Sequence, residues 1–141
     1  MKKQTLLLAA LCVSIGLAVV PAFAQVGGVR VTVPFNFVVD NRTLLQGEYL
    51  ISSAKDNVFV QNSQGQTVAM VLSNAVAGRT AGKTGKVVFQ CYKQRCFLSE
   101  LWSPTQDAGR QLLKCPWEKE VGKRETATYF ALIGSAESRQ R

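Results

Sequence analysis

Strict alternation of apolar and polar residues dominates one long stretch of this chain. The segment VRVTVPFNFVV, residues 29–39, places an apolar side chain at every second position. A period of two that is sustained over this length predicts a long β-strand with one buried face. Pro34 has no amide hydrogen to give to a sheet ladder, so we expect this strand to lie at a sheet edge or to be broken there by a bulge.

Six further segments have the composition of short strands. They are rich in β-branched and aromatic residues, and several are bounded by turn residues such as glycine and asparagine. The segments are EYLIS (48–52), NVFVQN (57–62), TVAMVLS (67–73), KVVFQCY (86–92), RCFLSELW (95–102) and ATYFALI (127–133). Their spacing predicts two hairpins, one across the polar loop 63–66 and one across residues 93–94, whose Lys-Gln pair fits the tight two-residue turns poorly.

The hydrophobic period changes in the last third of the chain. Residues 105–113 are polar and are expected to contain a helical turn. Pro116 suits the first position of a helix that runs to about Glu125, with Trp117 and Val121 on its buried side. Six or seven strands and one short C-terminal helix predict a mainly β fold, either a single antiparallel β-sandwich or a small β-barrel. Both architectures bury alternating faces, so the pattern leaves the two open.

The N-terminus has the three parts of a secretory signal peptide. Lys2 and Lys3 supply a positive region, residues 6–20 are apolar, and Ala22 and Ala24 are the small residues that signal peptidase reads. The apolar run is shorter than the ~20 residues that a membrane-spanning helix needs, which argues against an uncleaved anchor. We therefore expect cleavage after Ala24 and export to the periplasm or the extracellular medium.

Cleavage would leave a chain of single-domain size. We expect a signal peptide over residues 1–24, one β-rich domain over 25–133 and a disordered tail over 134–141. The mature chain would keep all 9 acidic residues and lose two of the 17 lysines and arginines, which leaves a net charge of +6. This excess favours anionic partners such as lipopolysaccharide, acidic polysaccharide or a membrane surface, although simple solubility is the plainer explanation. No basic run is interleaved with aromatic residues, so nucleic-acid binding has little support.

The chain contains no histidine. Catalytic arrangements with an imidazole base and metal sites with a histidine ligand are therefore excluded. Among the carboxylates we considered Glu48, Asp56 and Glu100, and Glu100 is expected to share a strand face with Leu98 and Trp102. A paired-carboxylate hydrolase needs a second acid across a cleft, and an edge or ion-paired glutamate is the simpler interpretation. The sequence thus predicts no catalytic, cofactor-binding or metal-binding residue.

The stretch AGRTAGKT, residues 77–84, loosely fits the phosphate-binding loop pattern. Such a loop works only between a strand and a helix, because its backbone N–H groups meet the phosphates at the start of that helix. The residues after Thr84 read GKVVFQCYK, which is the composition of a strand. We therefore expect a basic connection between two strands and no nucleotide binding.

Three cysteines follow the expected cleavage site, Cys91, Cys96 and Cys115. If residues 93–94 form a two-residue turn, Cys91 lies directly opposite Cys96 at a non-hydrogen-bonded pair, with Cα atoms ~4.5 Å apart. In an oxidising compartment this predicts a structural disulfide rather than a redox centre, because the spacing is not Cys-x-x-Cys and no helix N-terminus activates a thiol. Cys115 would then pair between chains, react with a small thiol or lie buried beside Trp117.

Three segments, VPFNFVV, TLLQGEY and FLSELW, together resemble a family of small uncharacterised exported bacterial proteins. Members of that family read Val-Pro-Phe-x-Phe, Thr-Leu-Pro-x-Gly-x-Tyr and Phe-Leu-Ser-Glu-x-Trp, and this chain departs from the second motif with Leu45 in place of proline. The resemblance covers about residues 29–120. It implies a bacterial, exported, β-rich protein and assigns no activity, ligand or site residue.

These features predict an exported, non-catalytic β-domain that binds an apolar or anionic envelope component or another protein. The alternative is a structural protein of the envelope or matrix that associates with itself through the 29–39 edge or Cys115. A carboxylate-dependent hydrolase is the weaker alternative. A deep pocket would favour ligand binding, whereas a flat surface with an unpaired strand edge would favour association.

Overall fold

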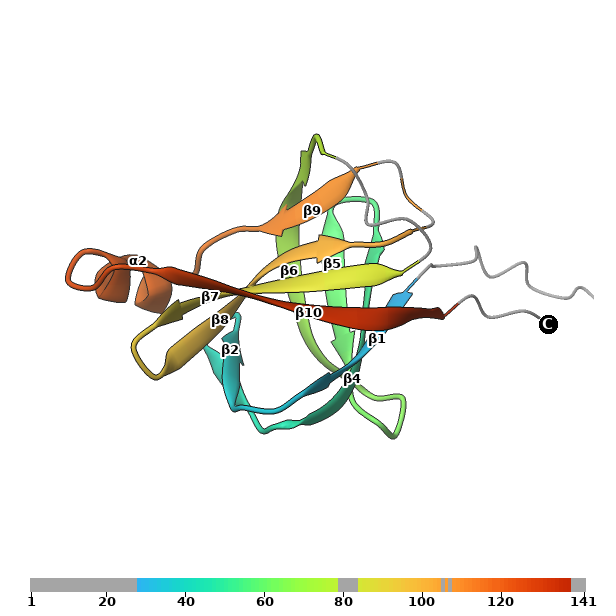
Figure 1. Cartoon of the computed structure of the whole chain (residues 1–141), viewed down its shortest axis with the longest axis horizontal. Coiled ribbons are helices and arrows are strands. Elements are labelled where there is room, and N and C mark those ends of the chain that lie inside the picture. The colour runs from blue at the N-terminus through green and yellow to red at the C-terminus, as the bar shows by residue number, and fades with distance from the viewer. Residues whose placement is uncertain (1–27, 79–83, 105, 107, 138–141) are drawn as a thin grey trace, which may run out of the picture.

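The apolar segments of the chain form one sheet of ten strands with a short helix at one end (Figure 1). The computed structural model describes residues 28–78, 84–104, 106 and 108–137. In chain order the elements are β1 (Gly28–Val33), β2 (Phe37–Val39), β3 (Arg42–Leu44), β4 (Gly47–Ala54), β5 (Asn57–Gln61), β6 (Thr67–Val76), β7 (Gly85–Tyr92), β8 (Arg95–Trp102), β9 (Gly109–Leu112), α2 (Pro116–Gly122) and β10 (Thr128–Glu137).

Eight of these strands close into an antiparallel barrel. Their order around the ring is β8-β7-β10-β1-β4-β5-β6-β9, and β9 pairs back with β8 to complete it. The β2–β3 hairpin lies beside the ring, where β2 runs parallel to β8. The expected mainly β fold with one short helix is confirmed, and the architecture is the barrel rather than the sandwich. The expected count of six or seven strands was wrong, because β2, β3 and β9 have only three or four residues each and are too short to show a period.

The long alternating segment 29–39 forms two strands instead of one. β1 ends at Val33 and β2 begins at Phe37, so the chain leaves the ladder at Pro34 as the sequence predicts. β1 pairs along its whole length with β4, and at its beginning also with β10. After this break the Phe37 side chain packs in the barrel core, where its ring lies edge-on to that of Phe89 with the ring centroids 5.4 Å apart.

Side chains fill the interior of the barrel. The buried set comes from both short and long strands and is largely valine, leucine and phenylalanine, as the alternating faces predict. Its fully buried members include Val29, Phe37, Ile51, Val58, Val60, Val87 and Phe89. The rings of Phe37 and Tyr49 meet edge-on at 5.1 Å, one of several T-shaped pairs in the core.

A second, smaller cluster lies under the helix at one end of the barrel. Val38, Tyr92, Phe97 and Val121 are buried there, and Cys115, Trp117 and Ala127 pack against them. Pro116 occupies the start of α2 as predicted, and Trp117 and Val121 face the cluster. The helix ends at Gly122 rather than near Glu125, and irregular turns follow it.

Two regions of the chain differ from their sequence-based prediction. The polar segment 105–113 contains β9, which closes the barrel, rather than only a helical turn. β10 runs to Glu137, so residues 134–137 belong to the barrel and not to a disordered tail. The expected signal peptide and residues 138–141 lie outside the described part of the chain. Within that part, no helix combines the length and apolar character that a membrane crossing requires.

Candidate functional site

The Cys91–Cys96 disulfide joins two strands that are already neighbours. Cys91 pairs directly with Cys96 across the β7–β8 hairpin, with their Cα atoms 4.0 Å apart. The two-residue turn between Tyr92 and Arg95 has the expected length, and Lys93 takes the positive φ that the tight turn requires. The bond lies at the end of the hairpin that carries Tyr92 and Phe97 into the helix cluster.

The remaining thiol, that of Cys115, lies at the start of α2. It is half-buried and packs beside Trp117 in the helix cluster. This placement agrees with burial beside Trp117, one of the three states that the sequence left open. Among the described residues, no group of three or more cysteines and carboxylates is placed to hold a metal ion.

The three candidate carboxylates each have a different partner. Arg30 Nη1 lies 2.6 Å from Glu48 Oε1, and Trp102 Nε1 donates to Glu100 Oε2 at 2.8 Å. Arg110 Nη2 lies 3.2 Å from Asp56 Oδ1. Glu48 is near the start of β4 and Asp56 is in the turn that follows its end, and β8, which holds Glu100, is across the ring from β4. The arrangement therefore forms no pair of facing acids of the kind that a hydrolase needs.

Glu100 lies beside Trp102, as its sequence position predicts, but it does not share a face with Leu98. The register of β7 against β8 shifts at Val88, so that Glu100 pairs with Val88 while Leu98 pairs with Phe89. Ser99 is the extra residue in this bulge, and both Leu98 and Leu101 face the core. The expected shared face of Glu100 and Leu98 was wrong because alternation fails across a bulge.

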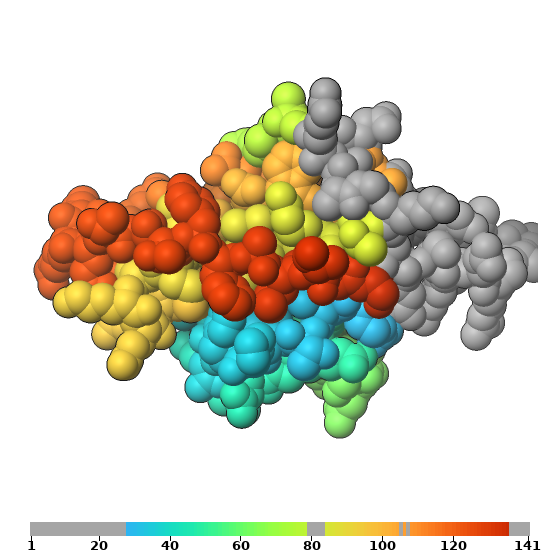
Figure 2. All heavy atoms as spheres, viewed as in Figure 1, coloured from blue at the N-terminus to red at the C-terminus, as the bar shows by residue number. Residues whose placement is uncertain are grey.

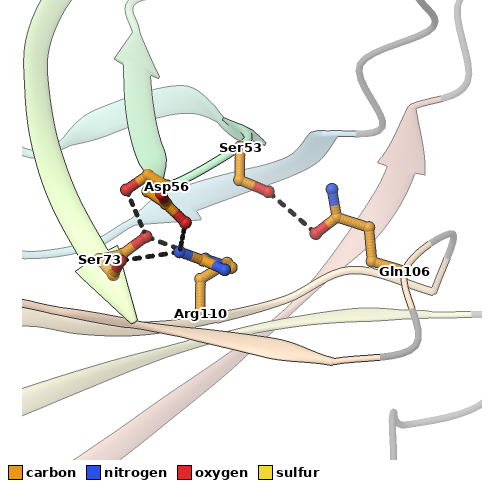
Figure 3. A network of polar contacts seen from close by, with 5 residues as sticks. All are labelled: Ser53, Asp56, Ser73, Gln106 and Arg110. Atoms are coloured by element: carbon orange, nitrogen blue, oxygen red, sulfur yellow. Dashed lines mark hydrogen bonds and ion pairs between the residues drawn. The ribbon is translucent and has the colours of Figure 1, made fainter. Parts of the chain in front are cut away.

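Arg110 anchors a polar network where the barrel closes (Figure 3). Its Nε donates to Ser73 Oγ at 2.9 Å and its Nη2 to the Ser73 carbonyl oxygen at 2.7 Å. Ser73 Oγ donates to the backbone oxygen of Asp56 at 2.9 Å. Nearby, Ser53 Oγ donates to Gln106 Oε1 at 2.9 Å. The Ser73 hydroxyl bonds to an arginine and to a backbone carbonyl, so this network joins β6, β9 and the turn after β4.

The stretch 77–84 is followed by a strand, as the sequence predicts. β7 begins at Gly85, one residue after Thr84, and no helix follows the loop. Residues 79–83 lie outside the described part of the chain. The strand-loop-helix context that a phosphate-binding loop requires is thus missing on its downstream side.

An open hollow of about 570 Å³ lies between α2 and β7. Tyr92, Lys114, Glu118 and Lys119 line it, and Tyr92 Oη donates a long, weak hydrogen bond of 3.4 Å to Glu118 Oε1. Burial raises the pKa of the Glu118 carboxyl above its ordinary value, although the Lys114 charge and the Tyr92 hydrogen bond oppose this. Burial also raises the pKa of Tyr92, and the Glu118 charge adds to the increase.

Strand β10 has an unpaired edge over much of its length. From Thr128 to Gly134 it pairs with β7 on one side. On the other side it pairs with β1 only beyond that point, from Ser135 to Glu137. Figure 1 shows β1 diverging from β10 at this place, and Figure 2 shows β10 as a red band that no segment in front covers. The described residues therefore leave the backbone of Thr128–Ile133 without a sheet neighbour on the β1 side.

The side chains along this free edge are apolar and exposed. Tyr129, Phe130 and Ile133 are 65%, 45% and 72% exposed. Residues on both faces of the strand are exposed from Thr128 to Ala131, so this part of β10 projects from the barrel. We call Thr128–Ile133 the β10 edge. Sequence reasoning found the strand but missed its exposure, because an unbroken apolar run such as YFALI is typical of a buried strand.

A second exposed apolar group provides a contrast. Met70, Leu72 and Leu113 are each about half exposed on the outer face of β6 and the residue after β9. β6 pairs with β5 from Thr67 to Leu72 and with β9 from Ser73 to Val76, and Leu113 N donates to the Leu72 oxygen at 3.0 Å, so Leu72 has a neighbour on both sides. Leu72 therefore lies where the backbone is bonded on both sides, whereas the β10 edge combines exposed apolar side chains with an unpaired backbone.

Comparison of this chain with protein-family models, with curated proteins and with solved structures finds no match.

Proposed function

We propose that this protein is an exported, non-catalytic β-barrel domain that binds another polypeptide, which adds a β-strand to the β10 edge. The observation that carries the proposal is the coincidence of an unpaired backbone from Thr128 to Ile133 with the exposed side chains of Tyr129, Phe130 and Ile133. In strand addition the main chain provides affinity and alternate side chains provide specificity.

The sheet edge of β10 has none of the features by which proteins protect such edges. Exposed edges are usually short, charged, interrupted by proline or covered. Residues 126–136 contain no charged residue and no proline. By contrast β3, the first strand in the sheet order, has three residues and carries an exposed arginine, Arg42. The β3 edge is thus protected, whereas the β10 edge is available for pairing.

Binding of a small ligand has weaker support. The barrel interior is occupied by its own buried side chains, among them Val29, Phe37 and Phe89. The hollow beside α2 is lined by Glu118 and Glu125 as well as by three lysines, and one of these, Lys123, is paired with Glu120 at 3.0 Å. Positive charge is therefore not concentrated at a site shaped for an anion.

Photo-crosslinking in the cells that produce the protein tests the proposal. A photoreactive phenylalanine analogue replaces Tyr129 in one variant and Leu72 in a control, because Leu72 is similarly exposed but has Asn57 of β5 on one side and a backbone hydrogen bond from Leu113 on the other. We expect a polypeptide adduct from position 129 and none from position 72. Adding Ala131→Lys, which places a charge on the exposed edge, should abolish the adduct. Equal labelling at the two positions, or an adduct that Ala131→Lys leaves intact, would refute strand addition.

A further inference from the structure

We infer that the strand that the β10 edge accepts is the β10 edge of a second copy of this chain, antiparallel to the first and related to it by a two-fold axis at Ala131. This inference rests on the proposed function and specifies the partner. It also places the self-association predicted from the sequence at β10, because β1, which begins the 29–39 segment, is already paired with β4 along its full length.

The pattern of side chains along the edge is self-complementary about Ala131. In an antiparallel pair centred on this residue, Tyr129 lies opposite Ile133 of the second copy, and Phe130 lies opposite Leu132 of the second copy. Tyr129, Ala131 and Ile133 share one face of the strand because successive side chains alternate. The two most exposed apolar side chains of the edge, Tyr129 and Ile133, would then cover each other twice in the dimer. Aromatic–aliphatic pairs of this kind stabilise adjacent strands.

Charge also favours a second copy at this place. A mature chain of net charge +6 would repel its own copy over most surfaces. Residues 126–136 carry no charge, so two β10 edges can approach without placing like charges opposite each other. An edge that binds a strand of a different protein can carry charge, because residues of opposite charge on the partner can lie across from it. An uncharged edge therefore favours an identical partner strand.

The length and accessibility of the edge are sufficient for a strand pair. Thr128–Ile133 spans six residues, which is the ordinary length of a β-strand in globular proteins. The ring centroids of Phe35 and Phe130 are 5.5 Å apart, and Phe35 fills the side of the gap between β1 and β10 that faces the barrel core. The face with Tyr129 and Ile133 remains open to solvent. A two-fold pair uses the edge of both copies, so the assembly closes as a dimer and does not grow into a fibre.

Cysteine crosslinking of the mature protein tests this arrangement, with Cys115→Ser as the background so that no other free thiol takes part. On the two-fold axis, Ala131→Cys faces its own copy at a Cα separation of about 4.5–5.5 Å, which a disulfide spans. Tyr129→Cys faces Ile133 instead, and the two copies of position 129 would be about 13 Å apart along the strands. We expect Ala131→Cys to form a covalent dimer under mild oxidation. Tyr129→Cys should crosslink only when it is mixed with Ile133→Cys, and the control Leu72→Cys should stay monomeric.

Charge exchange at the same position provides a second measurement that needs no oxidation. Ala131→Lys and Ala131→Glu each place like charges across the axis, so each variant alone should dimerise at least about tenfold more weakly than the native protein. A mixture of the two should recover a heterodimer in sedimentation experiments. Circular dichroism and an intact Cys91–Cys96 bond identify folded variants.

The outcomes separate the inference from the proposed function. A foreign polypeptide crosslinked at Tyr129, together with an Ala131→Cys protein that remains monomeric, would overturn the two-fold dimer and leave strand addition intact. Covalent dimers of Tyr129→Cys alone would overturn the register centred on Ala131. Absence of any adduct at position 129 and of any dimer would overturn both.

Discussion

Two seams close this barrel, and they are constructed differently. We call the junction of β9 with β8 and β6 the closed seam, and the junction of β10 with β1 the open seam. At the closed seam β9 pairs with β8 at Glu100 and Leu101 and with four residues of β6. At the open seam only the first three residues of β1 pair with β10.

The side chains at the two seams differ as much as the pairings. Arg110 bridges β9, β6 and the turn after β4 at the closed seam, where Ser73 and Asp56 accept its hydrogen bonds. The open seam is filled instead by the ring of Phe35, whose centroid lies 5.1 Å from that of Phe89 and 5.5 Å from that of Phe130. An aromatic ring excludes water from the core but cannot satisfy backbone N–H and C=O groups. At the open seam the core is therefore shielded from water, but the backbone hydrogen bonds of the sheet are left incomplete.

Gly134→Ala should have the largest effect, because it disrupts the only pairing of the open seam. A Cβ at this position would overlap the backbone oxygen of Arg30 and a methyl group of Val29. Since backbone cannot move as a flexible side chain can, we expect a loss of about 3 kcal/mol in the free energy of unfolding, measured by denaturant titration. Gly122→Ala is the control, because its Cβ would meet Tyr92 only at ordinary contact distance and alanine favours the helix. A Gly134→Ala protein as stable as the control would show that the open seam is not held by this crossing.

Phe35→Ala should destabilise the protein by about 2 kcal/mol, less than a fully buried phenylalanine, because Phe35 is only half-buried. Its loss removes the ring that separates Phe89 from solvent at the open seam. Hydrogen exchange should accelerate for the amides of β10 and β7 and remain unchanged for those of β5 and β6. Leu45→Ala, at an exposed position in a turn, should change neither quantity. Uniform acceleration over the whole barrel would contradict a local role for Phe35.

Arg110→Ala should cost about 1 kcal/mol, because it removes hydrogen bonds to Ser73 at the closed seam. Asp56→Ala should cost at most about 0.5 kcal/mol, since the Asp56 side chain is 81% exposed and its ion pair is screened by water and salt. Thermal or denaturant unfolding of the two single variants and the double variant measures the coupling between them. If the Asp56 variant were the less stable of the two, the ion pair and not the Ser73 contacts would hold this seam.

Glu118→Gln should have the smallest effect and lies away from both seams, in the hollow that adjoins the start of β10. Burial raises the pKa of Glu118 in the folded protein above the ordinary value of 4.5, so the fold favours the protonated carboxyl. The native protein therefore loses stability as pH rises from about the unfolded pKa through the folded one. The variant cannot ionise, and its stability relative to the native protein should increase between pH 4 and pH 7. Unfolding measured at both pH values checks the sign, and a difference that is constant with pH would contradict it.

Local features of this fold follow from the sequence. The β7–β8 hairpin illustrates this, because a two-residue turn at 93–94 fixes the opposition of Cys91 and Cys96 once both strands are recognised. The break at Pro34 and the helix start at Pro116 are likewise determined by the chemistry of one residue and its neighbours.

The features that distinguish this barrel are not local. Closure depends on the pairing of β9 with β8 and of β1 with β10. Neither pairing can be deduced from a short segment of the sequence. The bulge at Ser99, which puts Leu98 and Glu100 on different faces, depends on the register of the opposite strand. The candidate site is hidden for the same reason: the segment ATYFALI predicts a strand, but only the divergence of β1 leaves its edge free.

The pairing of β1 with β10 has a consequence for how this molecule is made. Val29 pairs with Ala136, so the first described strand of the barrel has a neighbour more than a hundred residues away along the chain. Closing so long a loop delays the formation of such contacts. Because synthesis starts at the N-terminus, β1 cannot pair with β10 until almost the whole chain has been made. Hairpins such as β4–β5 can form during synthesis, but the ring cannot. The topology thus keeps the barrel unclosed while the chain is still growing, which is the state in which a polypeptide can be threaded through a narrow channel.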